Sequence, residues 1–145
     1  HAWRVLRAAF AHPPPRRGTD LPGALERTMR SLKRRAVVCV LSDFISETSF
    51  TRPLGVLARR HQVNAFIVHD PLEEAIPAGL GLMELEDAET GKRRLVDSSK
   101  LAPRVPLDAR LKDIRKTGAW VTPVSTVDDP FAQLMQHFRR MEHSR

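Results

Sequence analysis

The stretch Ala36-Val37-Val38-Cys39-Val40-Leu41-Ser42-Asp43 decides the fold of this chain. Six apolar residues rich in valine follow one another, which is typical of a central strand covered on both faces in a parallel sheet. The run then ends in Ser42 and Asp43. Ligands of open α/β sheets bind beyond the carboxyl ends of strands, so these two side chains are placed for chemistry or for a metal. The position of Ser42 and Asp43 is equally compatible with a simpler role, in which the two side chains only cap the following turn.

The segments around this strand predict an α/β fold. Helices are expected at residues 2–11, 21–32, 51–60, 107–117 and from 130 onward, and further strands at 63–68, 81–86, 92–96 and 119–124. The order of these elements predicts a three-layer sandwich with a mainly parallel sheet and a small β-hairpin insertion. Pro123 removes a ladder donor, so its strand is expected at a sheet edge.

Several caps and faces can be assigned to the helices. Thr19 or Asp20 is expected to cap the second helix, and Thr51 the third. Gly118 is expected to end the helix that begins near Leu107. The last helix starts near Pro130 and carries four large apolar residues, which are Phe131, Leu134, Met135 and Phe138.

The composition indicates a globular protein with one core. The chain has 145 residues, of which 41% are hydrophobic. We divide it into residues 1–18, a helix with a Pro-rich linker, and residues 19–145, the main domain. Because no apolar run approaches the roughly 20 residues that span a bilayer, no membrane span is expected. The chain lacks an initiator Met, and we expect it to be part of a longer protein.

The single cysteine, Cys39, excludes an internal disulfide framework. Its place inside the apolar strand predicts a buried, inert thiol. A single cysteine is also compatible with a reducing compartment, and a cytoplasmic location is expected.

The positive charge is concentrated at the N-terminus. Residues 1–35 contain nine Lys or Arg and two Asp or Glu, and the other 110 residues contain 15 of each sign. A basic arm of this kind can bind nucleic acid or an acidic protein surface. Only Trp3 and Phe10 are interleaved with these charges, so no stacking platform for bases is apparent.

The candidate site residues are Thr19, Ser42 and Asp43. Thr19 precedes a helix, and Asp43 follows the strand into which that helix leads. Ser42, Asp43 and a histidine could form a hydrolase triad, but the chain has no Gly-x-Ser-x-Gly motif. A set formed by His69, Asp70, Glu73 and Glu74 could bind a metal, although an Asp-Pro step more often turns the chain. No glycine-rich phosphate loop is present, which disfavours a nucleotide enzyme.

Several motifs together resemble the "domain of unknown function 58" family over roughly residues 18–140. The motifs are Gly18-Thr19-Asp20-Leu21, Arg34-Arg35-Ala36-Val37-Val38 leading to Leu41-Ser42-Asp43-Phe44, His69-Asp70-Pro71-Leu72-Glu73, Leu85-Glu86-Asp87-Ala88-Glu89-Thr90-Gly91 and Val96-Asp97-Ser98-Ser99. That family is similar to von Willebrand factor type A domains, which are Rossmann-like. The resemblance implies that this chain is the C-terminal part of such a domain.

The resemblance also implies a metal-ion-dependent adhesion site. In that site one loop supplies a threonine, which Thr19 matches, and another supplies an aspartate, which Asp43 matches, with Ser42 beside it. The Asp-x-Ser-x-Ser loop that supplies the other ligands is absent from this chain. We therefore expect weak or no metal binding and no cofactor here, with Mg²⁺ bound in the intact parent protein.

The function implied by the resemblance is that of a non-enzymatic interaction domain in a bacterial, cytoplasmic protein. The implied partner is a MoxR-type AAA+ ATPase, in the assembly or maturation of other proteins. Without the family's first strand, the strand at 36–41 would expose one edge, so self-association is expected. The alternatives are nucleic-acid binding through residues 1–35 and, third, a metal-dependent hydrolase.

Overall fold

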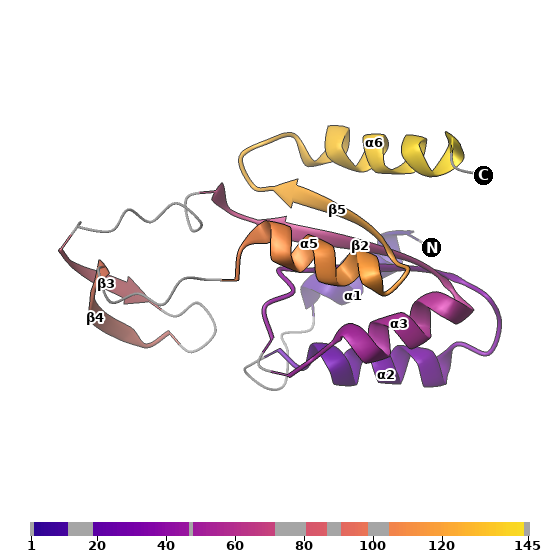
Figure 1. Ribbon diagram of the computed structural model, residues 1–145, viewed down its shortest axis with the longest axis horizontal. Coiled ribbons are helices and arrows are strands. Elements are labelled where there is room, and N and C mark those ends of the chain that lie inside the picture. Colours follow the sequence, from indigo (N-terminus) through magenta and orange to yellow (C-terminus); the bar gives the residue numbers. More distant parts are fainter. Residues whose placement is uncertain are drawn as a thin grey trace.

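A computed structural model describes residues 2–11, 19–46, 48–71, 81–86, 91–98 and 105–143 (Figure 1). These residues form a mixed α/β fold with a three-stranded parallel sheet and a separate antiparallel pair of strands. The elements are α1 (Ala2–Ala11), α2 (Leu21–Ser31), β1 (Val37–Ser42), α3 (Thr51–Arg60), β2 (Gln62–His69), β3 (Leu82–Glu86), β4 (Arg93–Asp97), α5 (Leu107–Lys116), β5 (Trp120–Ser125) and α6 (Pro130–His143). The predicted mixed fold, the parallel sheet and the antiparallel pairing of the two short strands are confirmed, whereas the three-layer arrangement stays a prediction.

The parallel sheet has the strand order β1-β2-β5. β2 is the strand covered on both faces, because the five consecutive residues 63–67 are buried. In the described sheet β1 is an edge strand, which agrees with the exposed edge expected at residues 36–41 but not with the prediction of a central strand covered on both faces. Its side chains alternate between partly buried and exposed, since neighbouring residues of a strand point to opposite faces. An uninterrupted apolar run therefore does not require cover on both faces.

One face of the sheet carries the hydrophobic core. Val38 and Val40 of β1 and alternate residues of β2 pack there against helices α2, α3 and α5. Leu54 and Leu57 of α3 and Ile114 of α5 are fully buried in this core. Burying each such side chain contributes roughly 1.5–3 kcal/mol. This face therefore supplies most of the hydrophobic stabilisation.

Helix α6 covers part of the opposite face (Figure 1). Its His137 contacts Asn64 of β2 and Thr122 of β5, which have the opposite side-chain direction from the core residues Val63 and Val121. The buried side of α6 is formed by His137 and Met141. Among the apolar residues noted in the sequence, Phe131, Met135 and Phe138 are exposed. The apolar residues of α6 suggested a hydrophobic contact with the sheet. The side chain that contacts Asn64 and Thr122 is instead the polar His137.

The predicted helix ends are only partly confirmed. Gly118 ends the α5 segment with a φ of 84°, a left-handed conformation that glycine adopts without strain. Thr51 does not cap α3, because Phe50 occupies the N-cap position without a side-chain hydrogen bond. The prediction that Pro123 marks an edge strand is confirmed by the place of β5 in the sheet.

In the antiparallel pair, Arg93 of β4 donates to Glu86 of β3 at 2.9 Å. Of the proposed hairpin turn at 88–91, residues 88–90 lie outside the described residues, as do the prolines of the linker at 13–15, whereas Gly91 has a left-handed φ of 66°. None of the helices in the described ranges is long and apolar enough to cross a membrane.

Candidate functional site

The turn after β1 holds two of the three candidate site residues. The Ser42 hydroxyl accepts a hydrogen bond from the Phe44 backbone N–H at 3.0 Å, and Asp43 Oδ1 accepts one from the Ile45 N–H at 3.0 Å. Phe44 has a left-handed φ of 55°, which costs a residue with a side chain roughly 1–3 kcal/mol. Its buried ring packs edge-on against Phe50, with 5.4 Å between ring centres. Ser42 and Asp43 therefore stabilise a strained turn.

A buried arginine supports the same turn from α5. Arg110 is buried, and its Nη1 donates to the Asp43 backbone carbonyl oxygen at 2.8 Å. Arg110 is not among the site residues predicted from the sequence. A signal was present, because Arg110 shares the helical stripe of Leu107, Leu111 and Ile114, whose spacing predicts an inward-facing side. Arg110 is thus a positioning residue for the backbone at Asp43.

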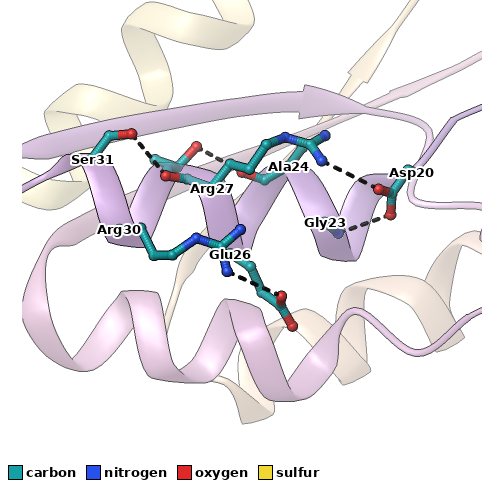
Figure 2. Close-up of polar contacts among 8 residues, drawn as sticks. Asp20, Gly23, Ala24, Glu26, Arg27, Arg30 and Ser31 are labelled. Atoms are coloured by element: carbon teal, nitrogen blue, oxygen red, sulfur yellow. Dashed lines mark hydrogen bonds and ion pairs between the residues drawn. The ribbon is translucent and has the colours of Figure 1, made fainter. Parts of the chain in front are cut away.

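The start of α2 holds the third candidate, Thr19. Asp20, and not Thr19, is the helix cap: its Oδ1 accepts from the Gly23 N–H at 2.9 Å, and its Oδ2 lies 3.5 Å from Arg27 Nη1 (Figure 2). Thr19 is exposed directly before this cap. Leu21 and Phe44 belong to the same core cluster. The start of α2 and the turn after β1 therefore lie at the same end of the sheet.

These residues do not fit a complete metal site. Within the described ranges, no three His, Cys, Asp or Glu side chains are grouped so that they could hold a metal ion. Asp43 Oδ1 already accepts a backbone hydrogen bond. Mg²⁺ prefers six oxygen ligands in octahedral geometry, and Thr19 with Asp43 supplies too few of them. In the alternative set, Glu73 and Glu74 lie outside the described residues.

The face of β1 opposite the core is an exposed apolar surface. We call Val37, Cys39 and Leu41 the β1 face. Val37 is 62% and Leu41 is 67% exposed, and Cys39 is exposed between them. The prediction of a buried thiol was wrong, because α6 covers β2 and β5 and leaves this part of the sheet uncovered. In the described sheet, the outer edge of β1 has no paired strand.

A polar network that was not predicted from the sequence lies beneath α6. His137 Nδ1 is 2.8 Å from Thr122 Oγ1, and His137 Nε2 is 3.0 Å from Asn64 Oδ1. Arg140 Nη2 donates to the same Thr122 oxygen at 2.7 Å. Burial, with a smaller contribution from the Arg140 charge, lowers the pKa of His137 below its ordinary value of 6.5. The imidazole is therefore neutral near pH 7.

The geometry of this network assigns its protons. Because Thr122 Oγ1 accepts from Arg140, its own hydrogen is available to donate to His137 Nδ1. His137 then carries its proton on Nε2 and donates to Asn64 Oδ1. Among the described residues, the buried Asn64 Nδ2 has no hydrogen-bond acceptor. The sequence signal for this network was Asn64, a polar residue within an otherwise apolar strand.

The chain resembles several mycobacterial proteins. It is 36% identical to uncharacterized protein MAV169 of Mycobacterium avium over 94 residues, which are 65% of this chain and 50% of the relative. It is 34% identical to uncharacterized protein Rv1480 of Mycobacterium tuberculosis and to uncharacterized protein Mb1516 of Mycobacterium bovis over 93 residues. Those residues are 63% of this chain and 29% of each relative.

The chain thus spans half or less of the curated relatives that it matches. No solved structure matches it significantly. The profile described as "Protein of unknown function DUF58" matches residues 1–117, which is most of the chain and includes Thr19, Ser42, Asp43 and Arg110. With a match of this extent, the chain belongs to the DUF58 family.

Proposed function

We propose that this chain is a non-enzymatic protein-interaction domain and that the β1 face, with the adjacent strand edge, is its docking surface. The observation that carries this proposal is the exposure of Val37 and Leu41 on an edge strand. An unpaired edge offers a row of backbone donors and acceptors to an extended segment of another chain. Burying the two side chains would add roughly 1.5–3 kcal/mol each.

The contrast between the two sheet edges supports this assignment. β5, the other edge strand, contains Pro123, which cannot donate a ladder hydrogen bond. β1 contains no proline and no charged residue from Val37 to Ser42. Natural sheets commonly protect a free edge with such residues. Their absence favours β1 as the edge that pairs.

We propose two occupants for this edge. A second copy of the chain can pair there, because the edge is open and apolar. The resemblance to the DUF58 family further supports a MoxR-type AAA+ ATPase as the partner of the whole bacterial protein. Because both would bind β1, the two associations would compete. In this proposal, Thr19 and Asp43 coordinate Mg²⁺ only in the longer protein.

Self-association can be tested with two matched variants. Leu41→Lys places a charge on the β1 face, whereas Leu95→Lys places one at a position that is 68% exposed on β4. Light scattering over a concentration series should show that the unaltered chain and Leu95→Lys associate and that Leu41→Lys stays monomeric. The reactivity of Cys39 toward an aromatic disulfide reagent should fall as association proceeds. A strict monomer with constant Cys39 reactivity would contradict self-association.

The ATPase is tested separately with the same variants. Each chain, labelled at its C-terminus, is titrated with a purified MoxR-type ATPase from the same organism, and binding is followed by fluorescence anisotropy. We expect binding by the unaltered chain and by Leu95→Lys, and its loss in Leu41→Lys. Absence of binding by the unaltered chain would reject this partner without bearing on self-association.

Nucleic-acid binding is the competing function, and the charge of residues 1–35 favours it. Arg34 and Arg35 are exposed immediately before β1. A gel-shift assay over a range of salt concentrations separates the two functions, because phosphate contacts weaken steeply as salt rises. Absence of a shift at low salt rejects nucleic-acid binding. A saturable, salt-sensitive shift that Leu41→Lys leaves unchanged would favour it over docking at β1.

A further inference from the structure

A cleft lies where the end of α5, the start of β5 and the second half of α6 meet. It has a volume of about 370 Å³, within the range of small-molecule sites. Arg115 comes from the last turn of α5, Trp120 begins β5, and His137 and Arg140 come from α6. The backbone at Gly118 forms part of the wall between them. The cleft is therefore built from three elements of the chain.

The charge of this cleft is positive. Two arginines line it, and none of the described residues that line it is an Asp or a Glu. Arg115 forms none of the ion pairs found in the described part of the chain. Since basic side chains in a last helical turn also interact with the helix dipole, each arginine alone could be explained in that way. The dipole does not explain why both line one cleft.

The polar network holds one of these arginines in place. Arg140 donates to Thr122 Oγ1 at 2.7 Å, and the same hydroxyl contacts the buried His137 at 2.8 Å. Part of the guanidinium is thus fixed on the surface of β5. The hydrogen bond to Thr122 uses one of the five donors of the planar guanidinium fork. Pre-organised donors of this kind suit the oxygens of a phosphate group.

The remaining walls favour a small molecule over a peptide strand. The indole of Trp120 is partly exposed in the cleft and offers a planar apolar surface. Pro123 removes a donor from β5, which disfavours the addition of a strand along this edge. The family profile matches residues 1–117, so Arg115 is the only one of the described lining residues that lies within it.

We propose that this cleft binds a small molecule carrying a phosphate group, with the phosphate between Arg115 and Arg140 and with Trp120 as an apolar wall. The free phosphate ion and a phosphate ester share the chemistry that the arginines recognise. An ester with a planar ring would gain additional contact with the indole. The site is independent of the β1 face, so either proposal can fail alone.

Trp120 provides the readout for a direct test. The chain has two tryptophans, and the exposed Trp3 is removed by Trp3→Phe, so that emission reports on Trp120 alone. The probes are AMP, inorganic phosphate and adenosine. We expect a saturable change in Trp120 emission with AMP and no saturable change with adenosine. AMP binding more tightly than phosphate supports a contact with the indole, and equal affinities support recognition through the phosphate alone.

Arginine variants test the assignment of the phosphate contact. In the Trp3→Phe background, Arg115→Ala should weaken AMP binding at least about tenfold, as expected for loss of a charge-assisted hydrogen bond. Arg59→Ala is the matched control, because Arg59 is an exposed arginine in the last turn of α3 and does not line the cleft. Circular dichroism confirms that each variant is folded.

Three results would overturn the proposal. The first is the absence of a saturable response to both AMP and phosphate at millimolar concentrations. The second is adenosine binding as tightly as AMP. The third is an unchanged affinity for AMP in the folded Arg115→Ala variant.

Discussion

At the scale of single residues, His137 gives the chain a predictable pH dependence. Its pKa is lowered in the folded chain, whereas the unfolded chain retains the ordinary value of 6.5. As the pH falls below 6.5, the unfolded chain binds more protons than the folded chain, so the free energy of unfolding decreases. Well above pH 6.5 His137 is neutral in both the folded and the unfolded chain, so its protonation no longer reduces the free energy of unfolding. The maximum slope from one group is about 1.4 kcal/mol per pH unit.

Urea unfolding at pH 7.5, 6.5 and 5.5 measures this effect. We expect His137→Gln to be less stable at neutral pH and to lose part of the decrease on acidification. His143→Gln is the control, because His143 is exposed near the end of the same helix. If His137→Gln and the unaltered chain show the same pH slope, the assignment to His137 is wrong.

Asp43 is predicted to contribute little metal affinity in this chain. Its Oδ1 is engaged by the Ile45 N–H, and the described residues offer no cluster of three acidic, His or Cys side chains. Calorimetric titration with Mg²⁺ and Mn²⁺ should show no micromolar binding. Asp43→Ala and Asp128→Ala, an exposed control, should behave like the unaltered chain. Micromolar affinity that only Asp43→Ala abolishes would contradict the prediction.

At the scale of elements, the cap of α2 couples two residues. Asp20→Ala removes the hydrogen bond to the Gly23 N–H and should cost about 1 kcal/mol of stability. A Cβ on Gly23 would clash with Asp20 Oδ2, so Gly23→Ala forces the capping carboxylate away. Without that carboxylate, alanine should stabilise the helix by up to about 1 kcal/mol relative to glycine.

Gly23→Ala is therefore expected to change sign between the two backgrounds. It should be neutral or destabilising with Asp20 present and stabilising in Asp20→Ala. A double-mutant cycle by urea unfolding measures the interaction free energy. Strictly additive effects would show that the carboxylate moves without loss of the cap. Ser31→Ala, at the other end of α2, provides a control that should be additive with Gly23→Ala.

The elements themselves were largely predictable from the sequence. The predicted start of α2 at residue 21 and the predicted limits of α3 at 51 and 60 agree with the structure. Such features depend on residues three or four apart, whose side chains share one face of a helix. Pro123 likewise indicated an edge strand because its missing donor is a local property.

The supporting contacts of the candidate sites could not be predicted in the same way. Arg110 meets the Asp43 carbonyl across 67 residues of sequence, and His137 meets Asn64 across 73. No local periodicity encodes such pairs, and a polar residue within an apolar pattern does not reveal its partner. The apolar run of β1 likewise did not predict which of its side chains are exposed. Burial is favourable for the apolar residues of β1, but the packing of neighbouring elements determines which of them are covered.

At the scale of the whole molecule, the unequal edges of the sheet limit the size of an assembly. If two copies pair through β1, both outer edges of the joined sheet are β5 strands that contain Pro123. We expect the mean mass in light scattering to rise with concentration and to level off at twice the 16.4 kDa of one chain. Pro123→Val restores a donor on the outer edge and should permit larger species. Unlimited growth of the unaltered chain would contradict this limit.

A single open edge also means that a dimer formed through β1 holds two chains whose docking strands are both occupied. Every copy paired through β1 is withdrawn from the pool that can bind another protein at that strand. By mass action, once dimers dominate, the concentration of chains with a free β1 rises only as the square root of the total concentration. Doubling the amount of protein would then raise the available docking surface by a factor of about 1.4. Self-pairing would thus buffer the supply of chains with a free β1 against changes in the total concentration of this chain.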